Sequence, residues 1–157
     1  MILLTVGTQL PFDRFVKIVD EAAPGIGTPI FAQTGYGSYE PKNMEWQKML
    51  RPSEFDEILS RATCIVSHAG VGTVVIAQKY RKPVILFPRR AALKEHRNDH
   101  QMATIGSLEG RQGVYIARTD AELIALLGQP LLPPDESIEI PSRIRLREAI
   151  VKFIEAN

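Results

Sequence analysis

The chain has 157 residues, 45% of them hydrophobic, which is enough for one domain with a substantial core but short for two. Nineteen basic and eighteen acidic side chains give a formal net charge of +1, so the charge does not favour nucleic acid as a partner. The single cysteine, Cys64, lies in an apolar run and fits a small buried hydrophobe in a reducing, cytoplasmic setting. No segment approaches the ~20 apolar residues of a membrane span and no basic leader is evident, so we expect a soluble chain.

Short apolar runs alternate along the chain with segments of helical period. The apolar runs predict strands at residues 2–6, 29–33, 64–67, 83–87 and 113–117. The segments between them predict helices at residues 12–23, 53–62, 71–80, 97–110 and 120–128. The strands are apolar at consecutive positions, which is typical of strands that helices cover on both faces. The sequence therefore predicts an α/β domain with a parallel sheet over residues 1–128.

The end of the chain has a different composition. Residues 129–141 are rich in proline and predict a connector, and residues 142–157 predict an amphipathic C-terminal helix. This helix would pack either on a partner protein or on its own domain, and both alternatives stay open. Trp46, with Met44 and Met49 nearby, is expected to serve core or edge packing.

Polar and glycine-rich segments follow the predicted strands, at the edge of a parallel sheet where ligands bind. They are residues 7–9, 34–38, 67–73 and 88–90. In the segment 67–73, SHAGVGT, a strand leads directly into a helix. Its glycines let a ligand approach the backbone, and the N–H groups of the helix start attract an anion, although the same glycines also permit a tight turn. The spacing matches neither a dinucleotide fingerprint nor a Walker A loop, so it indicates a generic anion site.

A second polar cluster lies at residues 87–101, FPRRAALKEHRNDHQ. Arg89 and Arg90 offer charge for a diphosphate, and the helix start after them, including Asn98, offers hydrogen-bond donors for a sugar. A solvated helix start with capping residues has the same composition. A metal chelate is a further alternative, but no second carboxylate or cysteine cluster completes it, and we expect no metal or other cofactor. This chelate would be built on His96, Asp99 and His100.

The motifs VSHAGVGT, KPVILFPRRAALKEHRNDHQMA and LLTVGTQLPFDRFV resemble the carboxy-terminal, donor-binding domain of glycosyltransferase family 28, over residues 2–117. Their combination is most similar to small stand-alone subunits that pair with a membrane-associated partner. These are the cytosolic subunit of the dolichol-pathway N-acetylglucosaminyltransferase and the bacterial exopolysaccharide glucuronosyltransferase subunits. The resemblance implies a Rossmann-like open parallel sheet with helices on both faces, which is one half of a GT-B architecture.

The resemblance also implies a site for a nucleotide-sugar donor. The positions that match the family's glycine loop near the diphosphate are Ser67, His68, Ala69, Gly70, Val71, Gly72 and Thr73. The other matching positions are Gly7 and Thr8 in the first loop, Arg89 and Arg90 as in the bacterial subgroup, and His100 and Gln101 near the donor sugar. One position departs from the pattern, because Ile76 stands where larger members carry the acidic residue that holds the ribose. Glu95 or Asp99 is the substitute that the sequence offers.

The expected chemistry follows from the leaving group. Departure of a nucleoside diphosphate leaves negative charge, which a helix N-terminus and cations stabilise in the transition state without a metal. We assign catalytic roles to Arg90, as such a cation, and to His68, which would orient the loop, bind the donor or act as a base. By analogy, the base that deprotonates the acceptor belongs to the partner subunit.

The sequence thus predicts the donor-binding subunit of a two-part glycosyltransferase. It would move glucuronic acid or N-acetylglucosamine from a UDP-sugar to a polyprenyl-diphosphate-linked saccharide in exopolysaccharide biosynthesis. Activity is expected only with the membrane-associated, acceptor-binding partner, which would recruit this cytoplasmic chain to the inner face of the membrane. A homodimer of the isolated chain stays open. The alternatives are a non-catalytic nucleotide-sugar-binding module and an epimerase or hydrolase, which would need a second Rossmann domain in the same chain.

Overall fold

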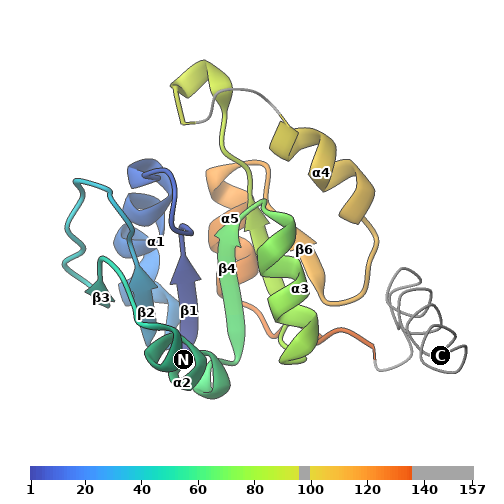
Figure 1. The fold of residues 1–157 in the computed structure, drawn as a ribbon, viewed down its shortest axis with the longest axis horizontal. Coiled ribbons are helices and arrows are strands. Elements are labelled where there is room, and N and C mark those ends of the chain that lie inside the picture. The colour runs from blue at the N-terminus through green and yellow to red at the C-terminus, as the bar shows by residue number, and fades with distance from the viewer. Residues whose placement is uncertain (96–99, 136–157) are drawn as a thin grey trace, which may run out of the picture.

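The computed structural model describes residues 1–95 and 100–135 of the chain. These residues form a six-stranded parallel sheet with helices on both faces (Figure 1), which confirms the predicted α/β, Rossmann-like fold. The predicted C-terminal helix at 142–157 and the second part of the connector lie outside the described residues. None of the helices in the described part of the chain is long and apolar enough to cross a membrane.

The strand order reverses in the middle of the sheet. The strands are β1 (Ile2–Thr5), β2 (Ile30–Gln33), β3 (Glu45–Gln47), β4 (Cys64–His68), β5 (Val84–Phe87) and β6 (Val114–Ile116). Their order across the sheet is β3-β2-β1-β4-β5-β6, so the chain winds outward from β1 on one side and from β4 on the other. The loops after β1 and β4 therefore leave the sheet toward opposite faces, and a crevice opens between them at the carboxyl ends of the strands.

The helices cover the two faces of the sheet. They are α1 (Asp13–Ile26), α2 (Pro52–Arg61), α3 (Val71–Lys79), the 3-10 helix η1 (Ala91–Leu93), α4 (His100–Leu108) and α5 (Asp120–Leu127). The sequence analysis predicted all of these except η1. It ended this helix at residue 23, directly before Pro24, and a residue before proline usually avoids the helical conformation. In the structure α1 continues through Pro24 to Ile26, and the next residue, Gly27, caps it with a left-handed φ of 70°.

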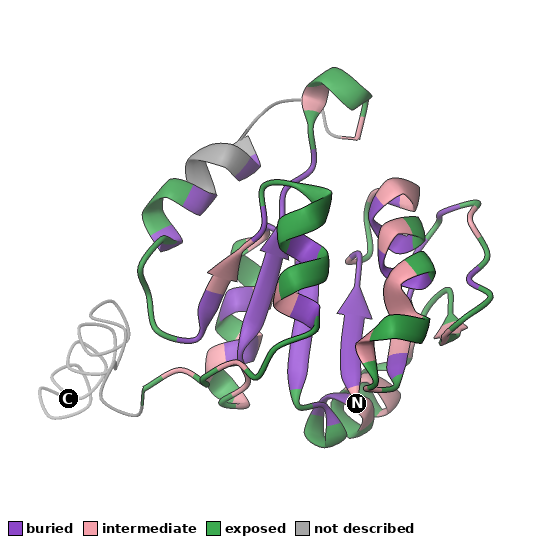
Figure 2. Ribbon diagram, turned by 180° about the vertical axis from the view of Figure 1, so that it is seen from behind, coloured by how far each residue is buried: buried purple, intermediate pink, exposed green. Residues whose placement is uncertain are grey.

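Alternate residues of each central strand enter two separate cores. In β1, Ile2 and Leu4 pack toward α1 and α5, whereas Leu3 packs toward α2, α3 and α4. The central strands β1 and β5 are accordingly buried along their length, while the outer helix faces are exposed (Figure 2). Cys64 contributes to the first core as predicted, and burial raises the pKa of its thiol to about 12. This two-sided burial explains why the strands are apolar at consecutive positions.

Two segments at the edges of the sheet complete the packing. Strand β3, which the sequence analysis did not predict, carries the half-buried Trp46 against the first core, so the expected edge packing of this residue is confirmed. At the other edge, the first part of the proline-rich segment packs along β6. The main-chain N–H of Leu132 donates to Tyr115 Oη at 2.8 Å, and Tyr115 Oη donates to the carbonyl of Leu132 at 3.2 Å. Residues 129–135 are therefore a bound strap on the sheet edge.

Candidate functional site

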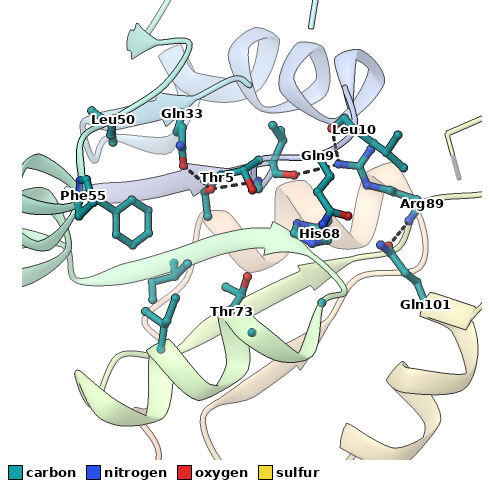
Figure 3. Close-up of a pocket in the computed structure, with 18 of the residues that line it drawn as sticks. Thr5, Gln9, Leu10, Gln33, Leu50, Phe55, His68, Thr73, Arg89 and Gln101 are labelled. Carbon is teal, nitrogen blue, oxygen red and sulfur yellow. Dashed lines mark hydrogen bonds between the residues drawn. The ribbon is translucent and has the colours of Figure 1, made fainter. Parts of the chain in front are cut away.

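A cavity of about 590 Å³ lies at the carboxyl ends of the strands, where the strand order reverses (Figure 3). Leu50 and Phe55 lie at one end of the cavity (Figure 3), and its other apolar lining residues include Pro52, Ile65 and Ile76. Gln9, His68, Arg89 and Gln101 lie at the other, polar end (Figure 3), and Gly7 and Thr8 also line the cavity. Between them lie the ends of β1 and β2 and the first turn of α3. The cavity thus joins a surface suited to a flat apolar group with one suited to a hydrogen-bonding group.

Hydrogen bonds between neighbouring strands build the floor of the cavity. Thr5 Oγ1 at the end of β1 donates to Gln33 Oε1 at the end of β2, at 2.8 Å. The N–H of Gly7 donates to the same Thr5 oxygen at 3.2 Å, and Gly7 has a left-handed φ of 78° that favours glycine. Thr5 and Gln33 are both buried. The sequence analysis missed these two residues, although their position at the ends of apolar strands was the available signal.

Ser67 connects β4 to β1 and to α3. Its side chain is fully buried, and Oγ donates to the carbonyl of Thr5 at 2.8 Å. The same Oγ lies 3.3 Å from His68 Nδ1 and 3.2 Å from Thr73 Oγ1. One hydroxyl therefore ties together two strand ends, the first turn of the following helix and the imidazole of His68.

The imidazole of His68 occupies a slot between two glycines. A Cβ at Gly7 would lie 2.8 Å from His68 Cε1, and a Cβ at Gly70 would lie 2.6 Å from His68 Nε2. A Cβ at Gly72 would meet nothing within 4 Å. The glycines of the SHAGVGT motif therefore differ in function: Gly70 makes room for the ring, whereas Gly72 leaves the start of α3 open where it borders the cavity.

Arg89 is held inside the protein by main-chain carbonyl groups. Its side chain is buried, and Nη2 donates to the carbonyls of Val6 at 2.9 Å and Leu10 at 2.8 Å. Nη1 donates to the carbonyls of Pro11 and Glu95, and the guanidinium packs over a phenylalanine ring. Burial lowers the pKa of Arg89 to about 10, against the opposing charge of Glu95, so the group remains a cation at neutral pH. The guanidinium thus supports the loop after β1, and only part of the residue borders the cavity.

Arg90 and Glu95, two further residues assigned from the sequence, are absent from the described lining of the cavity. Arg90 is exposed, and its Nη2 donates to the carbonyl of Arg118 at 2.8 Å. The carboxylate of Glu95 accepts two hydrogen bonds from Arg14, at 2.6 and 3.0 Å, and one from the N–H of Arg90. Glu95 therefore joins α1 to the loop after β5, and a role at the ribose would compete with this ion pair.

Gln101 and Asp56 add polar groups at opposite ends of the cavity. Gln101 Oε1 accepts from the main-chain N–H of Arg89 at 3.0 Å, so its amide nitrogen is the group left for other partners. Asp56, which the sequence analysis missed, lines the apolar end and accepts from Tyr80 Oη at 2.7 Å. It lies one turn of helix from the cavity residue Pro52 on α2. Asp56 thus places a carboxylate where Ile76 offers none.

The remaining assigned residues are placed as follows. Ala69 is buried, Val71 is exposed on α3, and Thr8 and Thr73 line the cavity. His100 begins α4, whereas Asn98 and the proposed metal ligands His96 and Asp99 lie outside the described residues. Within residues 1–95 and 100–135, no group of three or more His, Cys, Asp or Glu side chains is arranged to hold a metal ion.

Comparison with known proteins identifies the family. The sequence profile described as the glycosyltransferase family 28 C-terminal domain matches residues 1–136. The chain belongs to this family. As a family 28 domain with the observed sheet, it is a glycosyltransferase donor-binding module, as the sequence resemblance implied.

Solved structures with the same fold include other glycosyltransferases. The NMR structure of ALG13 matches with a TM-score of 0.61 and 18% identity, over 92% of this chain and 93% of that one. The glycosyltransferase SnogD from Streptomyces nogalater matches with a TM-score of 0.53 and 18% identity, over 94% of this chain and 36% of its own. The glycosyltransferase VinC in complex with DTDP matches with a TM-score of 0.52 and 18% identity, over 96% and 36%. This chain thus matches about a third of the length of SnogD and of VinC. A search of curated proteins gave no significant match.

Proposed function

We propose that this chain is the donor-binding subunit of a two-part glycosyltransferase that uses a UDP-sugar. The observation that carries the proposal is the position of the cavity, which lies at the reversal of strand order in a family 28 domain and combines an apolar end with a polar end. A nucleotide-sugar likewise has two unlike ends, since a flat base lies at one end and a polyhydroxylated sugar ring at the other. The diphosphate between them would lie at the first turn of α3.

The lining residues support one orientation of the donor. The apolar end near Phe55 suits the base, and the carboxylate of Asp56 beside it suits the ribose hydroxyls. The N–H groups at Gly72 and Thr73 begin a helix, where the backbone attracts an anion. The sugar would then extend toward His68 and the amide nitrogen of Gln101.

The proposed reaction transfers the anomeric carbon from the diphosphate oxygen to a hydroxyl oxygen of the acceptor. The bond from carbon to diphosphate breaks, a bond to the acceptor oxygen forms, and the hydroxyl proton passes to a base. The start of α3 stabilises the charge that develops on the leaving diphosphate. Arg89 contributes through the loop that it holds, because its donors are engaged by carbonyl groups. Arg90 would act on the diphosphate only after leaving the carbonyl of Arg118.

The acceptor half is proposed to come from a membrane-associated partner. SnogD and VinC each have further chain beyond the region that matches this domain, and the acceptor would need such a second half. We propose a polyprenyl-diphosphate-linked saccharide as acceptor, and glucuronic acid or N-acetylglucosamine as the sugar that is moved. The partner would recruit this cytoplasmic chain to the inner face of the membrane.

The proposal is tested by calorimetric titration of the purified chain with UDP, dTDP, UDP-glucose, UDP-N-acetylglucosamine and UDP-glucuronic acid. We expect UDP to bind, one UDP-sugar to bind more tightly, and dTDP to bind more weakly. Transfer to a lipid-linked acceptor in the presence of the co-expressed partner would separate the enzyme from a non-catalytic sugar-nucleotide-binding module. Failure of every nucleotide to bind, both to the chain alone and with the partner, would contradict the proposal.

A further inference from the structure

We infer that the side chain of Gln33 selects the base of the nucleotide, because its amide nitrogen donates a hydrogen bond to the oxygen on C4 of uracil. The inference rests on the proposed function, since it assumes that a donor places its base at the end of the cavity near Phe55. It goes beyond that proposal by naming the side chain that distinguishes uracil from cytosine. The argument starts from a nearly buried polar group that borders a partly apolar cavity.

The cavity is bordered by apolar side chains from two helices on one face of the sheet. Phe55 of α2 and Ile76 of α3 are half-buried, and both pack against the core that contains Ile65 of β4. A flat ring fits between apolar side chains of this kind. Asp56, the next residue after Phe55, is exposed. A ribose bound to Asp56 would therefore stay on the solvent side, and the base would point inward.

Gln33 lies at the inner side of this space. It is the last residue of β2, its exposed fraction is only 4%, and it still lines the cavity. Strand β2 lies between β1 and β3 in the sheet, so Gln33 is on the side of the strand reversal that leads to Leu50 and α2. Figure 3 shows Gln33 and its neighbour Thr5 between Phe55 and the polar end of the cavity. A base that enters beside Phe55 would reach Gln33 with its inner edge.

Thr5 determines which atom of the Gln33 carboxamide is left for a ligand. Thr5 Oγ1 accepts from the N–H of Gly7 at 3.2 Å and donates to Gln33 Oε1 at 2.8 Å. The N–H of Gly7 cannot accept, so the carboxamide oxygen takes the Thr5 proton. Gln33 Nε2 makes no hydrogen bond within residues 1–95 and 100–135. A donor so deeply buried is costly to leave without a partner, and an accepting atom of a ligand is therefore favoured there.

A hydrogen-bond donor at this place distinguishes the two common pyrimidines. The ribose is attached to N1 of the ring, and C4 lies on the opposite side of the ring. With the ribose near Asp56, C4 is thus on the inner edge that faces Gln33. Uracil carries an accepting oxygen on C4, whereas cytosine carries an amino group that donates. Gln33 Nε2 would therefore bind uracil and would meet a second donor in cytosine.

The inference is tested by calorimetric titration with UDP and CDP, which share the ribose and the diphosphate. The wild type should bind UDP about tenfold more tightly than CDP, the effect of one hydrogen bond. Gln33→Glu keeps an oxygen for the Thr5 proton but replaces the donor with an acceptor, so it should prefer CDP. Gln33→Met removes the donor without adding a charge, and should bind the two nucleotides with similar affinity.

Gln47→Met is the matched control. Gln47 pairs with Gln33 across the sheet, but it is exposed and absent from the described lining of the cavity, so this variant should keep the wild-type preference. Urea unfolding shows whether each variant is folded, and Gln33→Met carries the test if the buried charge of Gln33→Glu prevents folding. In proton–nitrogen NMR, the side-chain amide signals that disappear in Gln33→Met should shift with UDP but not with ribose 5-phosphate.

The outcomes separate this inference from the proposed function. Equal affinity of the wild type for UDP and CDP, or a preference for UDP that survives in Gln33→Met, would overturn the role of Gln33 while a nucleotide site remains. Amide signals of Gln33 that do not respond to bound UDP would overturn it as well. If neither nucleotide binds to the chain alone or with its partner, the proposed function fails and the inference fails with it.

Discussion

Single residues of the glycine motif have separate tasks that follow from their immediate neighbours. Gly70 faces the Nε2 edge of His68, and Gly72 faces open space, although they are two positions apart. Neither of these two glycines has a left-handed backbone conformation, so the backbone itself does not require glycine at either position. The space around each glycine therefore decides how a methyl group is tolerated there.

A matched pair of substitutions tests this difference. We expect Gly70→Ala to destabilise the fold by about 1–3 kcal/mol, because the new methyl group would lie 2.6 Å from His68 Nε2 and would force the imidazole to move. Gly72→Ala lies near the start of α3 in open space and should be neutral or stabilising by up to about 1 kcal/mol, since alanine favours helix. Denaturant unfolding of both variants gives the comparison. Equal effects at the two positions would contradict the separation of their roles.

Arg89 determines the position of a whole segment, because its side chain attaches the loop between β1 and α1 to the end of β5. The loop presents the carbonyls of Val6, Leu10 and Pro11 to one guanidinium. The main-chain N–H of the same residue binds Gln101 of α4. Residues 7–10, which line the cavity, are thus positioned by a side chain from the opposite side of the strand reversal.

We expect Arg89→Met to cost roughly 2–4 kcal/mol of unfolding free energy, since the carbonyls of Val6, Leu10 and Pro11 lose a buried charged donor at once. Arg90→Met is the matched control. Its side chain is exposed and donates to one carbonyl, so its cost should stay within about 0.5 kcal/mol. Urea unfolding measures both variants. A cost for Arg90→Met as large as that for Arg89→Met would show that burial is not the deciding difference.

Two carboxylates of helix α1 accept hydrogen bonds from the loop between β2 and β3. Asp13 accepts hydrogen bonds from the N–H and Oγ of Ser38, and Asp20 accepts from the N–H of Lys42 and from Tyr39 Oη. Partial burial raises the pKa of Asp13, but the hydrogen bonds from Ser38 outweigh it and the net pKa lies below the ordinary 3.8. The bond from Tyr39 to Asp20 likewise raises the pKa of Tyr39 to about 12.

The lowered pKa of Asp13 gives the stability a defined dependence on pH. A carboxyl group with a depressed pKa in the folded state stabilises the protein above the unfolded-state pKa, and this contribution is lost as the pH falls through the folded-state pKa. Asp13→Asn should therefore reduce the loss of stability on acidification from pH 5 to pH 3. Ser38→Ala, which removes one donor, should reduce it by less. Urea unfolding across this range tests the prediction, and identical pH dependence in wild type and Asp13→Asn would refute it.

On the scale of the whole molecule, residues 1–135 contain the complete six-stranded sheet and the strap on β6. We expect a chain that ends after Asp135 to unfold cooperatively and to keep nucleotide affinity. A chain that ends after Gly128 loses the bonds between Leu132 and Tyr115 and should have a lower Tm. Circular dichroism and calorimetry compare the two truncations. Loss of the cooperative transition in the longer one would show that residues beyond 135 belong to the fold.

Much of the fold was predictable because the signals are local. Apolar runs and helical periods marked five of the six strands and the α-helices to within a few residues, apart from residues 97–99, which lie outside the described part. Strand β3 was missed because its three residues form no apolar run and two of them are exposed. For the site, SHAGVGT predicted a loop at a strand end, and Gly70, Gly72, His68 and Thr73 do line the cavity.

The sequence alone determined the order and type of the elements, since these depend on periodicity between residues close in the chain. It also indicated the family, because three motifs of the family occur in this chain in the family's order. Only the tertiary structure decided which partner each polar side chain meets. Arg89 and Arg90 are neighbours with the same chemistry, yet one enters a ring of carbonyls from a loop some eighty positions away and the other faces solvent. Such long-range contacts arise from strand pairing across the sheet, and no local pattern encodes them.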